Sequence, residues 1–314
     1  MAMSEFKVYS SLQDKTKQAM RRPPSVLVLT KDEEVNIADC LRTLAFSDDI
    51  VVLDSYSTDR TVEIARSFPN VRVIQRKFDN WSRHSNWALE NIDFKYPWVY
   101  YSDADERVTP ALAEELLQIA NDASRSHVAY RVRYKNIFLE QWIRRGGIYP
   151  VWIIRLFQPD KVRYEDREVN AHPIVNGSLG ELREHFLHYS FNKGLVPWFT
   201  KHNSYSQMEA HEAIRVRGLP FWEQVSQVMS SKDRAVRRRG LKNLSFRMPM
   251  RALMRFLYMY FVKLGMLDGR AGFHYSGMIS MYEYWISIKM AEHHGQWSEK
   301  TETLAAKLLS EESV

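Results

Sequence analysis

Short apolar stretches and amphipathic stretches alternate four times between residues 25 and 121, and this alternation restricts the possible folds more than any other feature. The apolar stretches are typical of buried parallel strands. The stretches between them have helical spacing, and several begin at capping residues or proline. The expected strands are residues 25–30, 49–54, 71–74 and 97–102, and the expected helices are residues 35–44, 59–68, 80–92 and 110–121. This order predicts an α/β fold, with a mostly parallel sheet flanked by helices on both faces.

The pattern changes after residue 121, where the remaining sheet strands are expected at residues 127–139, 151–157 and 182–190. From Lys193 onward the chain has helical character. We therefore predict an N-terminal arm (1–24), an α/β domain (25–192) and a helical C-terminal region (193–314).

Composition limits the partners and the compartment. The net charge of +6 and the isoelectric point near 9.2 favour an anionic partner, such as a nucleotide, a nucleic acid or an anionic lipid. The one cysteine, Cys40, excludes an intrachain disulfide and a cysteine-based zinc site. No signal peptide or long apolar run is visible, so we expect a cytoplasmic catalytic domain. The sequence does not indicate an oligomeric state.

Polar and acidic residues follow three of the expected strands. They are Thr30 with Asp32, then Asp54, and finally the group Asp103, Asp105 and Glu106. In parallel α/β sheets, ligands bind outside the carboxyl ends of the strands. An isolated Asp-x-Asp is usually just a solvated loop, but three strand ends at one edge favour a site. Carboxylate oxygens suit Mg²⁺ or Mn²⁺, which also bind phosphates.

Four segments, in this order and spacing, resemble the inverting family 2 glycosyltransferases with the GT-A (Rossmann-like) fold. The bacterial branch that builds lipopolysaccharide core and exopolysaccharide is the most similar. The segments are residues 25–37, with Asp32 in place of the usual Asn, residues 52–61, residues 78–89, and the D-x-D motif at residues 102–106. Each motif alone is weak, whereas the ordered set is specific.

The resemblance implies transfer of a sugar from a nucleotide-sugar donor, with UDP favoured by family habit. Asp105 would be the direct metal ligand, and Asp103 would contact the ribose or the metal. Thr30, Asp32 and Glu34 would line the nucleoside pocket, and Asp54 would bind the base. The family usually has a basic residue before the Asn of the third helix. Here that position is Ser85, so Arg83 is the candidate cation for the phosphates, and Asn86 would also contact the donor.

An inverting transfer also needs a general base that deprotonates the acceptor hydroxyl. Relatives carry this base in a V-H-E-like motif, but here the residues after Val169 are Asn170 and Ala171. Glu168 is the first candidate, Asp166 the second and His172 the third. Arg155 either pairs with these acids or reaches a phosphate.

The C-terminal region carries Arg247, Arg251, Arg255 and Lys263 at helical spacing beside a broad aromatic and aliphatic face. Such a helix can lie in a membrane interface, with its cations on anionic headgroups. Residues 247–263 are therefore predicted to contact an anionic membrane surface. Relatives of this branch commonly use lipid-linked acceptors, so we expect a peripheral protein on the inner face of the cell membrane.

Two other functions fit parts of the sequence. A nucleotidyltransferase would share the sheet, but it normally has a glycine-rich basic loop after the first strand, where this chain has Lys31-Asp32-Glu33-Glu34. A non-enzymatic basic module that binds membranes or nucleic acid would leave the acidic strand ends unexplained. We therefore expect a metal-dependent inverting hexosyltransferase that acts on a lipid-linked or polysaccharide glycan, with no nucleic-acid partner.

Overall fold

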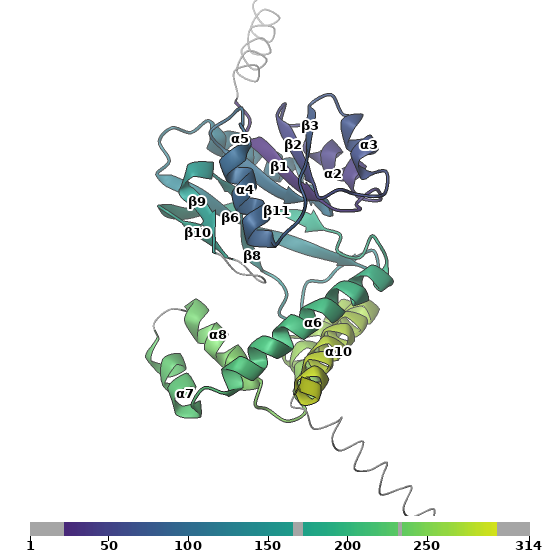
Figure 1. Cartoon of the computed structure of the whole chain (residues 1–314), viewed down its shortest axis with the longest axis vertical. Helices are drawn as coiled ribbons and strands as arrows, with labels where there is room; N and C mark the ends of the chain where they lie inside the picture. Colours follow the sequence, from purple (N-terminus) through teal and green to yellow (C-terminus); the bar gives the residue numbers. More distant parts are fainter. Residues whose placement is uncertain (1–21, 166–171, 232–233, 294–314) are drawn as a thin grey trace, which may run out of the picture. The chain divides into compact units, whose positions relative to one another are not determined.

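The chain forms two compact units, which a computed structural model describes over residues 22–165, 172–231 and 234–293 (Figure 1). The chain passes from the first unit to the second after Asn192, and one internal segment, Ile143–Ile148, also belongs to the second unit.

The first unit contains the predicted parallel strands. They are β1 (Ser25–Thr30), β2 (Ile50–Asp54), β3 (Val71–Gln75) and β4 (Val99–Asp103). Their order in the sheet is β3-β2-β1-β4, and every neighbouring pair is parallel. Because β1 and β2 are buried on both faces, their sequences are continuous apolar runs. The predicted α/β class is confirmed.

The sheet continues beyond β4 with strands of both directions. These strands are β5 (Glu106–Val108), β6 (His127–Phe138), β7 (Gln141–Trp142), β8 (Trp152–Phe157) and β11 (Ser178–His188). β8 runs antiparallel to both β4 and β6, and β11 lies parallel to β6. β6 and β11 therefore point in the same direction as β4, so the sheet remains mostly parallel. After the short 3₁₀ helix η1 (Pro159–Lys161), β9 (Val162–Tyr164) and β10 (Pro173–Val175) form a separate antiparallel pair.

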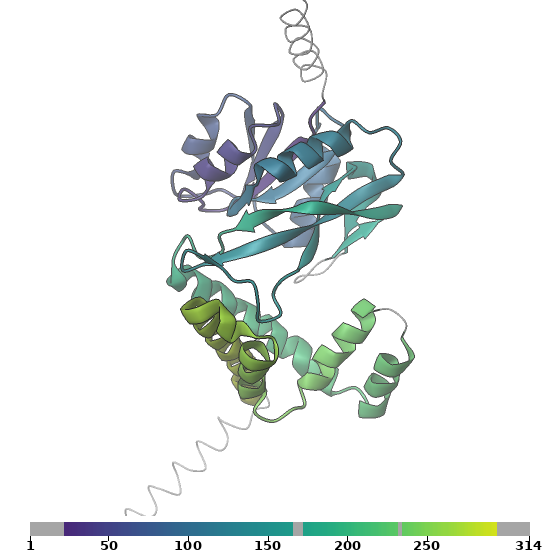
Figure 2. The ribbon, with the colours of Figure 1, turned by 180° about the vertical axis from the view of Figure 1, so that it is seen from behind.

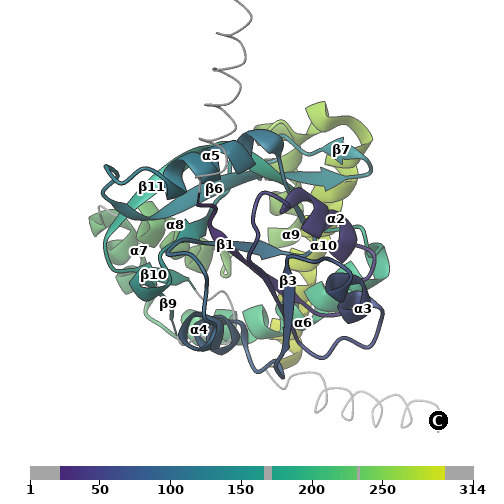
Figure 3. The ribbon, with the colours of Figure 1, turned by 90° about the horizontal axis from the view of Figure 1, so that it is seen from above.

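Helices cover both faces of this sheet, as Figure 3 shows with α4 and α5 on opposite sides of it. The four helices are α2 (Ile37–Thr43), α3 (Thr61–Arg66), α4 (Trp81–Asn91) and α5 (Pro110–Ala120). α2, α3 and α5 share one hydrophobic core with Val26 and Val28 of β1. α4 packs on the other face, where Ala88 joins a core with Leu27 and Leu29. The reverse view in Figure 2 shows α5 in front of the sheet.

The second unit is helical. It contains α6 (Leu195–Arg217), α7 (Phe221–Ser230), α8 (Arg234–Ser245), α9 (Arg251–Leu257), the π-helical turn η2 (Tyr258–Val262), the 3₁₀ turn η3 (Gly265–Asp268) and α10 (Gly269–His293). Its core lies between α6 and α10, where Ala210 and Ala213 pack with Ile286 and Met290. None of the described helices combines the length and the apolar content that a membrane-spanning segment requires.

The internal segment Ile143–Ile148 is held within the second unit by backbone hydrogen bonds. The Arg145 amide donates to the buried carboxylate of Asp268 at 2.7 Å. The Gly146 amide donates to the carbonyl oxygen of Lys263 at 3.0 Å. Gly146 has φ +73°, a conformation that glycine adopts without strain.

The basic side chains of residues 247–263 were expected to face a membrane surface, but two of them lie in a different environment. Arg251 forms an ion pair with Glu283 of α10 at 2.7 Å, and both side chains are largely buried. Arg247 donates to the carbonyl oxygens of Arg217 and Leu219, each at 2.7 Å. The prediction that these two arginines meet lipid headgroups is therefore wrong, because their guanidinium groups are used within the helical unit.

Two glycines allow η3 and α10 to pack closely. A Cβ atom at Gly272 would lie 2.0 Å from the carbonyl oxygen of Gly265, whereas one at Gly277 of the same helix would meet nothing within 4 Å. Gly272→Ala should therefore lower the free energy of unfolding by about 1–3 kcal/mol because α10 must shift. The control Gly277→Ala should be neutral or stabilising by up to about 1 kcal/mol. Urea unfolding followed by circular dichroism would measure both, and equal stabilities would contradict the packing argument.

Candidate active site at the carboxyl ends of the parallel strands

Three of the predicted site residues lie at one edge of the sheet. Thr30 of β1 is in register with Asp54 of β2, and Leu29 of β1 is in register with Asp103 of β4. Because the three strands are parallel neighbours, their carboxyl ends lie side by side. The predicted convergence of polar strand ends is confirmed.

The loops after β1 and β2 are joined to each other by carboxylates. One carboxylate oxygen of Asp32 accepts the Thr58 amide at 2.7 Å, and one of Glu34 accepts the Arg60 amide at 3.1 Å. Burial opposes ionisation of Asp32, but the Thr58 hydrogen bonds and the nearby Lys31 ammonium outweigh it and lower the pKa of Asp32. In this structure both acids stabilise the loops, and their contact with a nucleoside stays a prediction.

Asp54 is fully buried at the end of β2. Its carboxylate accepts hydrogen bonds from the Thr30 hydroxyl at 3.1 Å, the Ser57 amide at 2.9 Å and the Gln75 amide nitrogen at 3.1 Å, and also from the Ser57 hydroxyl. These bonds join the ends of β1, β2 and β3. Asp54 therefore supports the edge of the sheet from inside, and its contact with the base stays a prediction.

Arg155 connects two carboxylates that follow β4. Its Nη2 atom donates to Asp103 Oδ2 at 2.6 Å and also to Glu106. The guanidinium carbon lies 4.6 Å from the ring centroid of Tyr101, which fixes its plane from one side. Burial raises the pKa of Glu106 to about 8, although the Arg155 charge opposes this shift. Arg155 therefore pairs with acids of the D-x-D segment, which the sequence analysis did not expect, and its predicted contact with the candidate bases or a phosphate stays a prediction.

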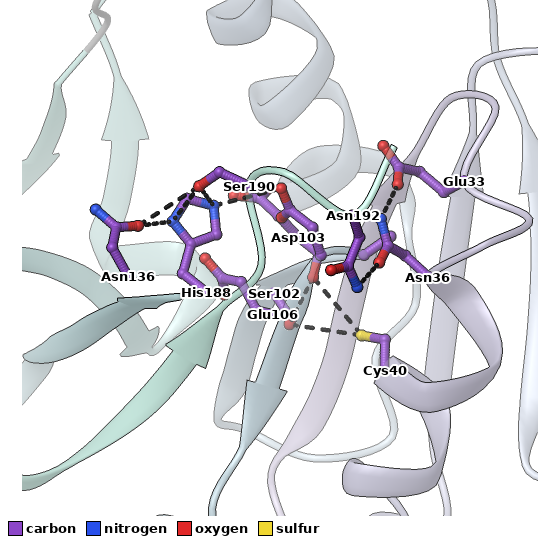
Figure 4. A network of polar contacts seen from close by, with 12 residues as sticks. Glu33, Asn36, Cys40, Ser102, Asp103, Glu106, Asn136, His188, Ser190 and Asn192 are labelled. Carbon is purple, nitrogen blue, oxygen red and sulfur yellow. Dashed lines mark hydrogen bonds and ion pairs between the residues drawn. The ribbon is translucent and has the colours of Figure 1, made fainter. Parts of the chain in front are cut away.

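Asp105 faces a histidine that the sequence analysis did not identify. His188, at the end of β11, places its Nε2 atom 3.3 Å from Asp105 Oδ2 and its Nδ1 atom 2.9 Å from the Asn136 side-chain oxygen of β6. Figure 4 shows His188 between Asn136 and Ser190. Burial lowers the pKa of His188, but its bond to Asp105 and the neighbouring acids outweigh burial, so the net shift is upward. The imidazole therefore has oxygen acceptors on both nitrogen atoms.

Asn86 and Arg83 belong to α4, which begins after the capping residue Asn80. The Asn86 amide group donates to the Tyr164 carbonyl oxygen at 2.9 Å and accepts the Tyr164 amide at 2.8 Å. These two bonds attach β9 to α4, and the contact of Asn86 with the donor stays a prediction. Arg83 lies in the first turn of α4 with an exposed side chain, and its role toward phosphates stays a prediction.

The predicted bases Glu168 and Asp166 lie outside the described residues. The residues on either side are joined, since the Glu165 amide donates to the His172 carbonyl oxygen at 3.1 Å. His172 itself is exposed and follows the same connection between β9 and β10. Both candidates therefore belong to the connection between β9 and β10, whereas the identity of the base stays a prediction.

Asp103 and Asp105 are the candidate ligands for a divalent metal. Their side chains are 33% and 25% exposed, so both reach solvent at the edge of the sheet. Among the described residues, no group of three or more histidine, cysteine or carboxylate side chains has the arrangement of a metal site. Mg²⁺ is usually held by one or two carboxylates together with substrate phosphates, so this oxygen donor pair fits the predicted Mg²⁺ or Mn²⁺.

Comparison with known proteins identifies the class of protein. The model of glycosyl transferase family 2 matches residues 25–176, which include the ends of β1, β2 and β4. This part of the chain belongs to glycosyl transferase family 2.

The similar proteins include a lipopolysaccharide core biosynthesis glycosyltransferase, LpsC, of Rhizobium meliloti. It is 25% identical over 197 residues, which cover 61% of this chain and 72% of LpsC. Glycosyltransferase SunS of Bacillus subtilis is 35% identical over 83 residues, covering 25% of this chain and only 19% of SunS. A crystal structure of TarS from S. aureus aligns over 88% of this chain and 93% of that chain, with 15% identity and a TM-score of 0.38.

The buried His84 predicts a pH dependence of stability. Burial lowers the pKa of His84 to about 4 from 6.5, helped by the Arg76 guanidinium, which contacts its Nδ1 atom at 2.8 Å. Between these values the unfolded chain binds a proton that the folded protein does not, so the free energy of unfolding should fall as the pH decreases from 6.5 to 4. Urea unfolding at several pH values should show a shallower fall in His84→Gln. The exposed control His274→Gln should keep the wild-type slope, and an unchanged slope in His84→Gln would contradict the assignment.

The Arg155–Glu106 pair predicts strong energetic coupling. Measured above pH 8, where Glu106 is ionised, Arg155→Met leaves a buried carboxylate without its counter-charge and should cost about 3–5 kcal/mol. Adding Glu106→Gln should restore part of this loss, which gives a coupling energy of about 1–3 kcal/mol in a double-mutant cycle. The exposed pair Arg60–Glu63 is the control and should show much weaker coupling. Additive losses at Arg155 and Glu106 would show that the two charges do not depend on each other.

Proposed function

We propose that this protein is a metal-dependent, inverting glycosyltransferase that moves a hexose from a nucleotide-sugar, probed first as a UDP-sugar, to a lipid-linked or lipopolysaccharide-type glycan. The observation that carries the proposal is the pair of carboxylates Asp103 and Asp105, both partly exposed at the edge where β1, β2 and β4 end. The name of LpsC, a lipopolysaccharide core glycosyltransferase, supports the acceptor class.

The residues around these carboxylates support a fixed binding geometry. Arg155 holds one oxygen of Asp103, and His188 approaches one oxygen of Asp105, so each carboxylate has a defined orientation. A bound Mg²⁺ or Mn²⁺ would neutralise the negative charge that develops on the departing diphosphate. Asp103 and Asp105 would hold this ion together with the phosphate oxygens, and Arg83 would add a positive charge.

The acceptor hydroxyl must lose its proton as it attacks the sugar carbon. We assign this general-base role to Glu168, with Asp166 as the second candidate, because both belong to the connection between β9 and β10. The two hydrogen bonds between Asn86 and Tyr164 support this assignment, since they fix β9 directly before the connection. The proton passes to the carboxylate of the base, and the diphosphate leaves from the opposite side of the sugar ring.

The proposed acceptor class also gives an expected place of work. A lipid-linked glycan is held at a membrane surface, so we propose that the enzyme acts as a peripheral protein on the inner face of the cell membrane. The contact would involve the exposed side chains within residues 247–263 of the helical unit, without Arg247 and Arg251.

Calorimetric titration with UDP and a panel of UDP-hexoses, with Mg²⁺ or Mn²⁺ present, tests the donor site. Asp105→Asn and Asp103→Asn should each weaken metal-dependent binding by at least about tenfold, because the ion loses a carboxylate ligand. Asp160→Asn, at an exposed acid of η1, is the control and should bind as the wild type does. Wild-type protein that binds no nucleotide or nucleotide-sugar with either metal would contradict the proposal.

A second experiment tests the general base independently of the donor site. Glu168→Gln should keep donor binding but lose nucleoside diphosphate release in the presence of membrane extract as acceptor, by about 10²–10⁴-fold. Asp166→Asn should lose much less. The reverse result would move the base to Asp166, and equal small losses would exclude both residues.

A further inference from the structure

A helical face in the second unit exposes its apolar side chains to solvent. Leu253, Met254, Leu257, Tyr258, Phe261 and Val262 are between 42% and 67% exposed, and we call these six residues the apolar face. Their spacing of one, three, one, three and one places them on one side of the helix that α9 and η2 form. Scattered apolar residues are normal on a surface, but a continuous row marks an interaction site.

On the opposite side of the same helix, the arginine side chains are partly buried within the helical unit. Arg251 pairs with Glu283, and guanidinium nitrogen atoms of Arg251 and Arg255 are buried. Met259, next to the exposed Tyr258, is fully buried. The helix therefore has the reverse of the usual arrangement, in which an amphipathic helix buries its apolar side against the protein. Solvent alone does not favour this orientation, so the apolar face needs a partner.

The apolar row continues into the turn that follows η2. Leu264, Met266 and Leu267 are 42–57% exposed around η3, and Phe273 at the start of α10 is 49% exposed. Gly265 is buried between them, where a Cβ atom would lie 2.8 Å from the carbonyl oxygen of Met259. This close packing fixes the turn, so its apolar side chains are held on the outside.

The charges around the apolar face identify the kind of partner. Lys263 and Arg270 are exposed beside it. Asp268 is the one carboxylate between residues 246 and 282, and it is buried against the Arg145 amide. A stretch that combines exposed apolar side chains with cations and no exposed acid of its own is complementary to anionic lipid headgroups over an acyl layer. A symmetric dimer through this face would bring like charges together.

We propose that the apolar face and the turn at residues 264–267 insert into the interface of an anionic membrane, with Lys263 and Arg270 at the headgroups. The contact lies in the plane of the bilayer, since none of the described helices can span it. Tyr258 and Phe261 are aromatic side chains of the kind that membrane interfaces favour. The proposal deepens the proposed function, because it states which surface would bring the enzyme to a lipid-linked acceptor. In this proposal the apolar side chains make the membrane contact that was first expected of the arginines.

Vesicle co-sedimentation of the full chain tests this inference without donor or acceptor. The wild type should bind vesicles of equimolar phosphatidylglycerol and phosphatidylcholine, and binding should weaken with salt and with pure phosphatidylcholine. Val262→Ser with Leu267→Ser should weaken binding by about tenfold or more, because two side chains of the inserted surface lose their apolar area. Val196→Ser with Leu139→Ser is the matched control, since these residues are 75% and 56% exposed and lie outside the face.

Three further outcomes are informative. If both double variants bind vesicles as the wild type does, insertion through this face is wrong. If the wild type binds no vesicles but sediments as a dimer that Val262→Ser with Leu267→Ser dissociates, the face is a contact between copies, and the membrane proposal fails. Binding of UDP-sugars by the same preparations is measured separately. Wild-type protein that binds UDP-sugars but no vesicles would therefore contradict this inference alone, whereas wild-type protein that binds vesicles but no UDP-sugar would contradict the proposed function alone.

Discussion

The acidic end of β4 depends on one positive charge, that of Arg155. Two carboxylates lie within reach of its Nη2 atom, and one of them, Glu106, is almost completely buried. A buried carboxylate that loses its partner is costly, so this guanidinium is what allows Asp103 and Glu106 to lie on one short stretch of chain. Because β8 lies between β4 and β6, the same side chain links the parallel half of the sheet to its mixed half. The geometry of the proposed metal site therefore depends on the pairing of strands that lie far apart in the sequence.

Sequence periodicity predicted the part of the fold that local sequence determines. The apolar runs of β1, β2 and β4 and the helices between them required a parallel sheet, and parallel neighbours bring Thr30, Asp54 and Asp103 together. The partner of Asp105 was not predictable in this way. His188 depends on Asn136, and the two meet because β11 pairs with β6 in a particular register. Periodicity predicts which face of each strand is buried, but it does not predict the register between strands that lie far apart in the sequence.

A second limit concerns which face of a helix is buried. Residues 247–263 have an apolar side and a basic side, and sequence alone favours burial of the first and solvation of the second. The structure has the opposite arrangement at Arg251, because Glu283 of α10 supplies a buried counter-charge. Asn86 illustrates the same limit, since its amide binds the backbone of Tyr164 in β9. In both cases the decisive partner comes from another element, which no pattern within the segment reveals.

The segment Ile143–Ile148 has a consequence for how this protein can be divided. It leaves the first unit between β7 and β8 and is bound by Asp268 and Lys263 in the helical unit. The two units are thus interleaved along the chain and are not arranged as a catalytic domain followed by a separable tail. A truncation after Asn192 would remove the acceptor of the Arg145 amide and the partner of Gly146 while leaving both residues in place. Exchange of the helical unit between related enzymes would therefore require transfer of this internal loop as well, so that two separate stretches of the gene move together.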